Sequence, residues 1–582
     1  MPRKSMFSFI AGLALAGCVS APSENNLVGD YLTGRIAARS NNVGVAAEAF
    51  GGVENRSADS DEILRGAFFF QVASGDIDEA AKLAPKILSN EDAEDDDLAR
   101  LVEAAHALKN KNYTGARAAL AANAEVEYFA AAMVILDAWA LAGEEGPEAG
   151  LKALAAKDGE TFRGFHPLHQ AFLFENAGLE DEARTAYQLS LMAYGGVVAR
   201  DAYGSFLERT GDVDDARAHY ELLAQYPGPD RQIAERGLER LNAGKADETW
   251  ADVTPQKGAA VALFTFGSAV LQQSIEQRDA AEKAGFRVGD ANYDMPLAFT
   301  RIALYLAPEF DHAQRLAGSI LNAYGDNQKA IAMLRDIPKS SPFYEQAQIE
   351  VAGGLIALDK TEEAKKLLRA LAQSKKSTEA RFAYANLLAS EDDHRGAVRE
   401  YGLLIGALPE DPPEDAWRYL VGRAASLLEL DEWPLAENDL KRAVEIAPQE
   451  AAALNYLGYS WAERGLNLDE AFDLIEKAVA IEPNSGAYID SLGWAHYQLG
   501  DYEEAVGHLE HAASLEPADP TITDHLGDVY WRLGRKLEAR YEWRRVLELE
   551  PTDALRKSVE KKIKKGLPDD NMAEGDVSKD GA

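Results

Sequence analysis

The sequence is poor in cysteine, in long apolar runs and in positive charge. A single cysteine, Cys18, occurs among 582 residues, which excludes a framework of disulfides within the chain. Beyond the N-terminal segment, we expect no stretch with the apolar length of a transmembrane helix. Asp and Glu outnumber Lys and Arg by 97 to 60, which gives a net charge of −37. Because nucleic acids and anionic lipid surfaces attract basic faces, this balance argues against both as partners.

Catalytic motifs are also missing. The sequence contains no Walker phosphate loop, no G-x-S-x-G turn and no H-E-x-x-H helix. His508 and His511 would share one face of a helix, where we expect them to be solvated rather than to bind a metal. Residues 290–294 resemble the start of a calcium loop, but Met295 stands where that loop needs glycine. We therefore predict a protein without enzymatic activity, cofactor or metal.

The N-terminus has the layout of an export signal. Two basic residues precede an apolar stretch from Phe7 to Ala16, which is too short to span a bilayer as a helix. Small residues follow this stretch. The layout predicts a secretory signal peptide over residues 1–17, cleaved between Gly17 and Cys18.

The four residues Leu15-Ala16-Gly17-Cys18 resemble the lipoprotein box of bacteria. The resemblance implies that the Cys18 thiol carries a diacylglycerol and that the freed amine is acylated. Several acyl chains would anchor the chain stably. The residue after the cysteine is Val19. In Gram-negative lipoproteins an Asp at this place often favours retention in the inner membrane. Its absence here therefore favours the periplasmic face of the outer membrane. The alternative is an ordinary secretory signal with an unrelated cysteine.

Three successive segments near the C-terminus repeat one pattern. They end at Pro483, Pro517 and Pro551, which are spaced by 34 residues. Small residues hold equivalent places in each segment: Gly458 and Ala471, Gly493 and Ala505, Gly527 and Ala539. This is the tetratricopeptide (TPR) pattern, in which each unit is a pair of antiparallel helices that approach closely at the small residues. We predict an all-α fold, a TPR-type helical-hairpin solenoid wound into a superhelix.

Weaker copies of the pattern recur upstream, and they predict about thirteen or fourteen helical pairs. Polar or irregular stretches divide the predicted array. The predicted order is a signal peptide (1–17), a lipidated tether (18–25), an N-terminal array (26–242), a joint (243–257), a central array (258–449) with an insertion near 276–294, C-terminal TPR repeats (450–551), a capping helix (552–566) and a disordered tail (567–582).

In TPR units the first helix lines the concave face through positions 2, 5, 9, 12 and 13. In the last three units these positions predict a protein-binding face formed by Asn455, Tyr459, Asp490, Trp494, Tyr497, Gln498, Asp524, Asp528, Trp531 and Arg532. Aromatic rings beside carboxylates suit an extended or basic peptide segment. The alternative is that several of these rings pack between repeats.

The C-terminal end is basic although the rest of the chain is acidic. One interpretation is a solvated cap whose charges favour helix C-termini; the other is a patch for an acidic partner, an anionic envelope polymer or another copy. The basic residues are Arg532, Arg535, Lys536, Arg540, Arg544, Arg545, Arg556, Lys557, Lys561, Lys562, Lys564 and Lys565.

The segments IDSLGWAHYQLGDYEEAVGHLEHA and DHLGDVYWRLGRKLEARYEWRRVL resemble the C-terminal block of proteobacterial TPR lipoproteins of the outer membrane. One branch of that group comprises adaptors of periplasmic C-terminal processing proteases. The resemblance implies protein partners, among them such a protease and the murein hydrolases it degrades. The alternative is a structural factor for outer-membrane, polysaccharide-export or secretion machinery. The oligomeric state stays open.

Overall fold

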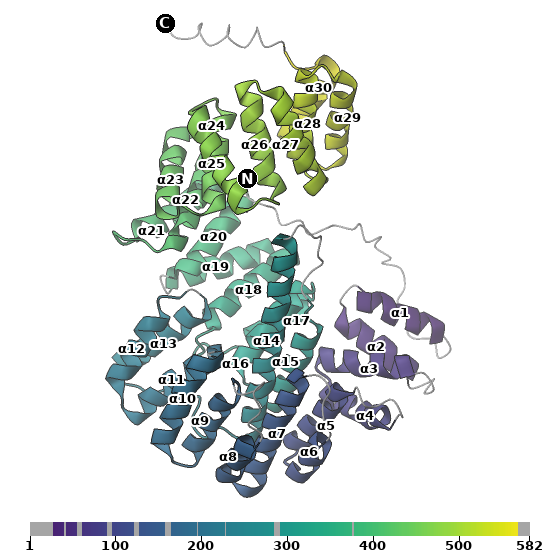
Figure 1. Ribbon diagram of the computed structural model, residues 1–582, viewed down its shortest axis with the longest axis vertical. Coiled ribbons are helices and arrows are strands. Elements are labelled where there is room, and N and C mark those ends of the chain that lie inside the picture. Colours follow the sequence, from purple (N-terminus) through teal and green to yellow (C-terminus); the bar gives the residue numbers. More distant parts are fainter. Residues whose placement is uncertain are drawn as a thin grey trace. The chain divides into compact units, whose positions relative to one another are not determined.

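A computed structural model describes residues 27–39, 42–54, 61–89, 96–121, 127–156, 164–194, 196–226, 228–283, 292–374 and 377–568 (Figure 1). The predicted signal peptide, the tether with Cys18, and residues 569–582 of the predicted tail lie outside the described residues. Within them the chain forms thirty α-helices and no strand, which confirms the all-α solenoid. By contacts, the chain divides into a larger unit, Ser8–Asp279 with Val288–Leu371, and a unit consisting mainly of Ala372–Ala582, called here the C-terminal unit.

The larger unit contains the helices α1 (Leu27–Arg39), α2 (Val43–Glu54), α3 (Asp61–Ser74), α4 (Ile77–Leu88), α5 (Asp97–Lys109), α6 (Tyr113–Leu120), α7 (Glu127–Glu145), α8 (Pro147–Ala156), α9 (His166–Asn176), α10 (Glu180–Tyr194), α11 (Val197–Thr210), α12 (Val213–Leu223), α13 (Pro229–Asn242), α14 (Pro255–Lys283), α15 (Asp294–Leu306), α16 (Asp311–Ala323), α17 (Asn327–Arg335) and α18 (Tyr344–Ala357), and most of α19 (Thr361–Ser374).

The C-terminal unit contains α20 (Thr378–Ser390), α21 (His394–Gly406), the 3₁₀ turn η3 (Glu414–Ala416), α22 (Trp417–Glu429), α23 (Trp433–Ile446), α24 (Ala451–Glu463), α25 (Leu468–Ile481), α26 (Gly486–Leu499), α27 (Tyr502–Leu515), α28 (Pro520–Arg532), α29 (Lys536–Glu548) and α30 (Asp553–Lys565).

The hairpin of α26 and α27 illustrates why the sequence folds in this way. Gly500 ends α26 with a φ of 86°, a left-handed conformation that suits glycine and turns the chain back. A Cβ at Gly493 would lie 2.8 Å from Leu509, so a larger residue there would push the two helices apart. Ala505 faces the same contact and is fully buried. Close helix packing therefore rests on small residues at these places.

Residues 243–254 differ from the predicted joint. The chain divides near Leu371, and this stretch lies inside the larger unit. Between α13 and α14 it runs without regular secondary structure, yet Trp250 and Val253 are each only 1% exposed. The polar composition of the stretch hid these two buried residues, because the packing partners of Trp250 lie far away in the sequence, at Phe172 on one side and at Phe310 and His312 on the other.

Helix α14 corrects two further expectations. Its segment Pro255–Ala281 is long and apolar enough to cross a membrane, with a mean hydropathy of 1.3 over an 18-residue stretch, although we expected no such stretch. Half of that 18-residue stretch is buried inside the protein, and Phe266 packs on Phe165 with ring centroids 4.5 Å apart, so α14 serves as a core helix. The predicted insertion begins as the end of this helix, which continues to Lys283; residues 284–291 lie outside the described residues.

Helix α15 brings distant parts of the larger unit together. It packs against α3, α4 and α5. The buried Arg301 donates from Nε to the carbonyl of Ala73 at 3.2 Å, and burial lowers its pKa to about 10. The hydroxyl of Tyr305 donates to Asp78 at 2.5 Å. The larger unit therefore closes on itself rather than staying an open array.

Candidate functional site

The predicted binding face lies on the first helices of the last three hairpins, α24, α26 and α28. We number each repeat so that the glycine closing the first helix, such as Gly500, is position 15. Position 5 then holds Asn455, Asp490 and Asp524, and position 9 holds Tyr459, Trp494 and Asp528. The three aspartates are each only 5–6% exposed. A buried carboxylate is costly unless it is hydrogen-bonded or paired with a cation. The contacts of each aspartate therefore show how this face is built.

Asp490 pairs with a histidine of the next repeat. The Nδ1 atom of His525 lies 3.0 Å from both carboxylate oxygens of Asp490. Burial disfavours the charged imidazole, but the attraction of Asp490 outweighs burial, and the pKa of His525 is raised. This contact ties α26 to α28 through a buried ion pair.

Trp494 packs between repeats rather than facing an open space. Its ring stacks on Tyr497, with centroids 4.5 Å apart and planes 6° apart, and on His525, with centroids 4.0 Å apart. Both faces of the indole are covered by these rings. Its Nε1 atom is buried and has no hydrogen-bond partner among the described residues. Trp494 therefore has a structural role in packing α26 against α28, and its ring faces are not open to a partner.

Lys562 of α30 neutralises the other two aspartates. Its Nζ atom donates to Asp524 at 2.8 Å and to Asp528 at 2.7 Å. Asp528 also accepts a hydrogen bond from Trp543 Nε1 at 2.9 Å. Burial, together with repulsion from Asp524, raises the pKa of Asp528 to about 6 despite Lys562. The two carboxylates form a receptor for an ammonium group, and the chain fills it with its own lysine.

Arg532 and Trp531 also contact the chain's own C-terminal segment. Arg532 donates from Nε to the hydroxyl of Tyr497 at 3.1 Å and from Nη1 to the carbonyl of Pro568 at 2.7 Å. The ring of Trp531 packs on Trp543 with centroids 5.4 Å apart. Any Cβ at Gly566 would overlap this indole. The end of the face is therefore covered by α30 and the residues after it.

The structure thus joins eight of the ten predicted residues into two contact networks, because the ring of Tyr459 also contacts His525, with centroids 6.5 Å apart. Two residues, Asn455 and Gln498, stay outside these networks and are partly exposed. The Oδ1 atom of Asn455 is buried and has no hydrogen-bond partner in the described part of the chain. Among the ten, these two side chains are the best placed to meet a partner.

Sequence reasoning missed His525 and Lys562. His525 is at position 6, one place beyond the positions taken to face the groove, but its spacing from Asp490 was a readable signal. Lys562 was grouped with a basic end that could be a solvated cap. Its side chain is instead only 15% exposed, and Arg540 likewise donates to the carbonyl of Ile563. His508 stacks on His496, and the described residues contain no group of three potential ligands for a metal.

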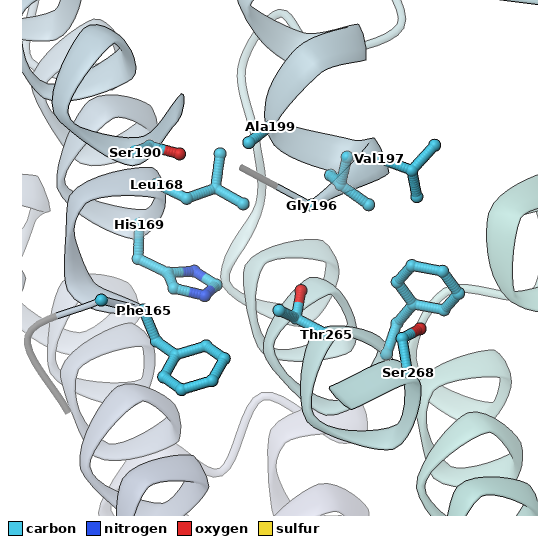
Figure 2. Close-up of a pocket in the computed structure, with 12 residues that line it drawn as sticks. Phe165, Leu168, His169, Ser190, Gly196, Val197, Ala199, Thr265 and Ser268 are labelled. Atoms are coloured by element: carbon cyan, nitrogen blue, oxygen red, sulfur yellow. The ribbon is translucent and has the colours of Figure 1, made fainter. Parts of the chain in front are cut away.

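A second feature is a cavity in the larger unit, lined by residues of α9, α10, α11 and α14 (Figure 2). Its volume is about 450 Å³, including its open mouth. Figure 2 shows the His169 ring pointing toward Thr265 of α14. His169 Nδ1 accepts a hydrogen bond from Trp139 Nε1 at 3.0 Å, and burial lowers its pKa to about 3. The imidazole is therefore neutral and serves as a packed acceptor.

Comparisons with known proteins agree with the repeat assignment. A model described as "TPR repeat" matches residues 493–534, and one described as "Tetratricopeptide repeat" matches residues 421–486. A TPR repeat-containing protein of Pseudomonas aeruginosa is 41% identical over 69 residues, which cover 12% of each chain. The chain thus carries TPR repeats, a class of repeat that generally serves in non-enzymatic protein–protein interaction.

Solved structures with similar folds were also found. The APC/C hetero-tetramer Cut9–Hcn1 is 17% identical, with 94% of this chain and 97% of that chain covered and a TM-score of 0.38. YrrB, described as a TPR protein with an unusual peptide-binding site, is 16% identical, with 33% and 96% covered and a TM-score of 0.25. A tetratricopeptide repeat protein from Parabacteroides merdae is 14% identical, with 44% and 97% covered and a TM-score of 0.36.

Proposed function

We propose that this protein is a lipid-anchored, non-enzymatic scaffold of the cell envelope that holds protein partners on the first-helix face of α24 and α26. The observation that carries the proposal is the set of TPR repeats, in which α24 and α26 carry the partly exposed polar side chains of Asn455 and Gln498. The lipoprotein-like sequence at Cys18 supports the anchor. The finer proposal is an adaptor that presents cell-wall hydrolases to a periplasmic processing protease.

An adaptor of this kind accelerates degradation without chemistry of its own. When one chain holds a protease and its substrate together, the second encounter becomes intramolecular, and the effective concentration is raised to roughly millimolar for a short tether. The acidic surface of the chain also suits partners with basic faces.

The test is a crosslinked pull-down of the mature protein from intact envelopes, read by mass spectrometry. We compare the wild type with Asn455→Ala/Gln498→Ala, two partly exposed positions, and with Glu476→Ala/Lys477→Ala, two exposed positions on α25, as a matched control. We expect a processing protease and murein hydrolases in the wild type and the control, and loss of one of them in the first variant. Recovery of export or secretion components instead would favour an assembly factor.

The anchor has its own test. Cells expressing the wild type or Cys18→Ser are labelled with radioactive palmitate and fractionated on a density gradient. The wild type should carry label and sediment with outer membranes, whereas the variant should carry none and be recovered in the periplasmic fraction. Label on Cys18→Ser, or an unchanged distribution, would contradict the proposal.

A further inference from the structure

Residues Asp247–Val253, called here the strap, lie against the first helices α9 and α11 as a segment of turns and bends, in which Asp252 has a φ of 47°. Backbone carbonyls at both ends of the strap accept hydrogen bonds from side chains of these helices. Asp247 accepts hydrogen bonds from Ser205 at 3.1 Å and from Arg209 at 3.0 Å. Val253 accepts one from Asn176 Nδ2 at 2.7 Å. Bound peptides are likewise held in part through their main chain.

The strap has two buried side chains, Trp250 and Val253, and Trp250 is the larger. Its ring stacks on Phe172 of α9, with centroids 5.6 Å apart and planes 16° apart. Its Nε1 atom donates to Asp201 of α11 at 2.9 Å, and burial raises the pKa of Asp201 to about 6. The ammonium group of Lys257 lies 4.6 Å from the ring centroid. A single aromatic anchor surrounded by weaker contacts is typical of a recognised segment.

The helix positions that hold the strap are those that TPR units use for partners. In α11 the contacts come from Asp201, Ser205 and Arg209, which are positions 5, 9 and 13. In α9 they come from Phe172 and Asn176, which are positions 9 and 13. The connection between α13 and α14, residues 243–254, is longer than the roughly 2–8 residues that usually join packed helices. A long connection of this kind often has a role of its own.

We propose that the inner face of α9 and α11 is a peptide-binding site that the strap fills, and that it accepts in trans a turn-forming segment of a partner protein with an indole anchor. The partner segment would resemble Asp247–Val253: an acidic residue, then tryptophan three residues later, then a β-branched apolar residue three residues after that. Since the strap is tethered at both ends, it competes at a high effective concentration, and a partner must displace it.

The test uses the full chain and a fluorescein-labelled peptide of residues 244–255. The Trp250→Ala chain should bind this peptide saturably by fluorescence anisotropy, and the wild type at least about tenfold more weakly because its own strap competes. A peptide with alanine in place of Trp250 should lose at least about tenfold in affinity. A peptide with alanine in place of Glu248, which is exposed, should bind like the parent. Equal binding of all three peptides, or none to the folded variant, would overturn the proposal.

A measurement on the wild type covers the case in which the variant does not fold. Native-state hydrogen exchange should show the amides of the strap exchanging through an opening that leaves α9 and α11 protected. If the strap amides exchange only together with those helices, the strap is a fixed part of the core, and the proposal is wrong.

Discussion

His169 and His525 occupy the same position of their repeats, two residues before the small residue at position 8, and both are buried. Their pKa values are nevertheless shifted in opposite directions. Burial, with the nearby His166, lowers the pKa of His169 to about 3, and this imidazole accepts a hydrogen bond from Trp139. His525 is buried too, but the carboxylate of Asp490 raises the pKa of His525. A carboxylate from the preceding repeat therefore distinguishes the two histidines.

The His525–Asp490 pair should make the C-terminal unit lose stability as the pH rises. A raised pKa in the folded state means that the contribution is fully present below the unfolded value of about 6.5 and is lost as the pH passes the folded value. We expect protection of α26 and α28 amides, measured by hydrogen exchange and corrected for intrinsic rates, to be higher at pH 6 than at pH 9.

Asp490→Asn should remove this difference and lower the protection at pH 6. Asp473→Asn changes an exposed carboxylate of α25 and should behave like the wild type. A pH difference that persists in Asp490→Asn would show that another group titrates.

His169 predicts the reverse pH dependence for its own part of the larger unit. A lowered folded pKa means that the unfolded chain takes up a proton below about pH 6.5 while the folded chain does not until about pH 3. Acidification from pH 6.5 to 4.5 should therefore lower the free energy of unfolding more in the wild type than in His169→Gln, which keeps an acceptor for Trp139. Urea unfolding at both pH values measures this free energy. An equal loss of stability in the wild type and in His169→Gln would contradict the prediction.

Lys562→Met should detach α30. The substitution leaves Asp524 and Asp528 buried and facing each other without a cation, and breaking a buried pair in this way costs about 3–5 kcal/mol. Limited proteolysis should cut α30 rapidly in the variant, whereas the exposed neighbour Lys561→Met should resist like the wild type. The double variant Lys562→Met/Asp528→Asn should recover part of the resistance to proteolysis. No recovery would mean that Lys562 stabilises α30 only through the packing of its aliphatic side-chain carbons.

Gly258→Ala should destabilise the larger unit by about 1–3 kcal/mol, since overpacking is costly. A Cβ at this position would overlap the buried ring of Trp139, which is 1% exposed. Gly353→Ala is the matched control, because Gly353 lies in α18 with open space around it and alanine favours helix by about 1 kcal/mol. The urea concentration at the midpoint of unfolding should therefore fall in Gly258→Ala and rise in Gly353→Ala. A change in the same direction in both variants would refute the packing argument.

Local sequence patterns predicted the repeats because each hairpin carries its own signals. Gly493, Gly500 and Ala505 stand at fixed places in the sequence, and each acts within one pair of helices. The contacts that the patterns missed join residues from different repeats or from segments outside the repeat frame. Lys562 reaches back 38 residues to Asp524, and Trp250 reaches back 49 residues to Asp201.

The candidate site was predictable only in part for the same reason. Position numbers placed Trp494 and Asp528 at equivalent positions of the first helices of their repeats. They did not reveal that Tyr497 and His525 cover the indole or that α30 supplies a cation to the aspartates. A side chain's availability depends on what the next repeat places beside it, and one repeat's pattern does not contain that information.

The strap also has a consequence for the order in which the chain reaches the envelope. Helix α11 ends at Thr210, and the anchor Trp250 follows roughly 40 residues later. A chain exported from its N-terminus delivers the two helices that receive the indole before it delivers their occupant. During that interval the chain presents Asp201 and Phe172 without Trp250. An envelope chaperone or a partner that arrives then meets no competitor.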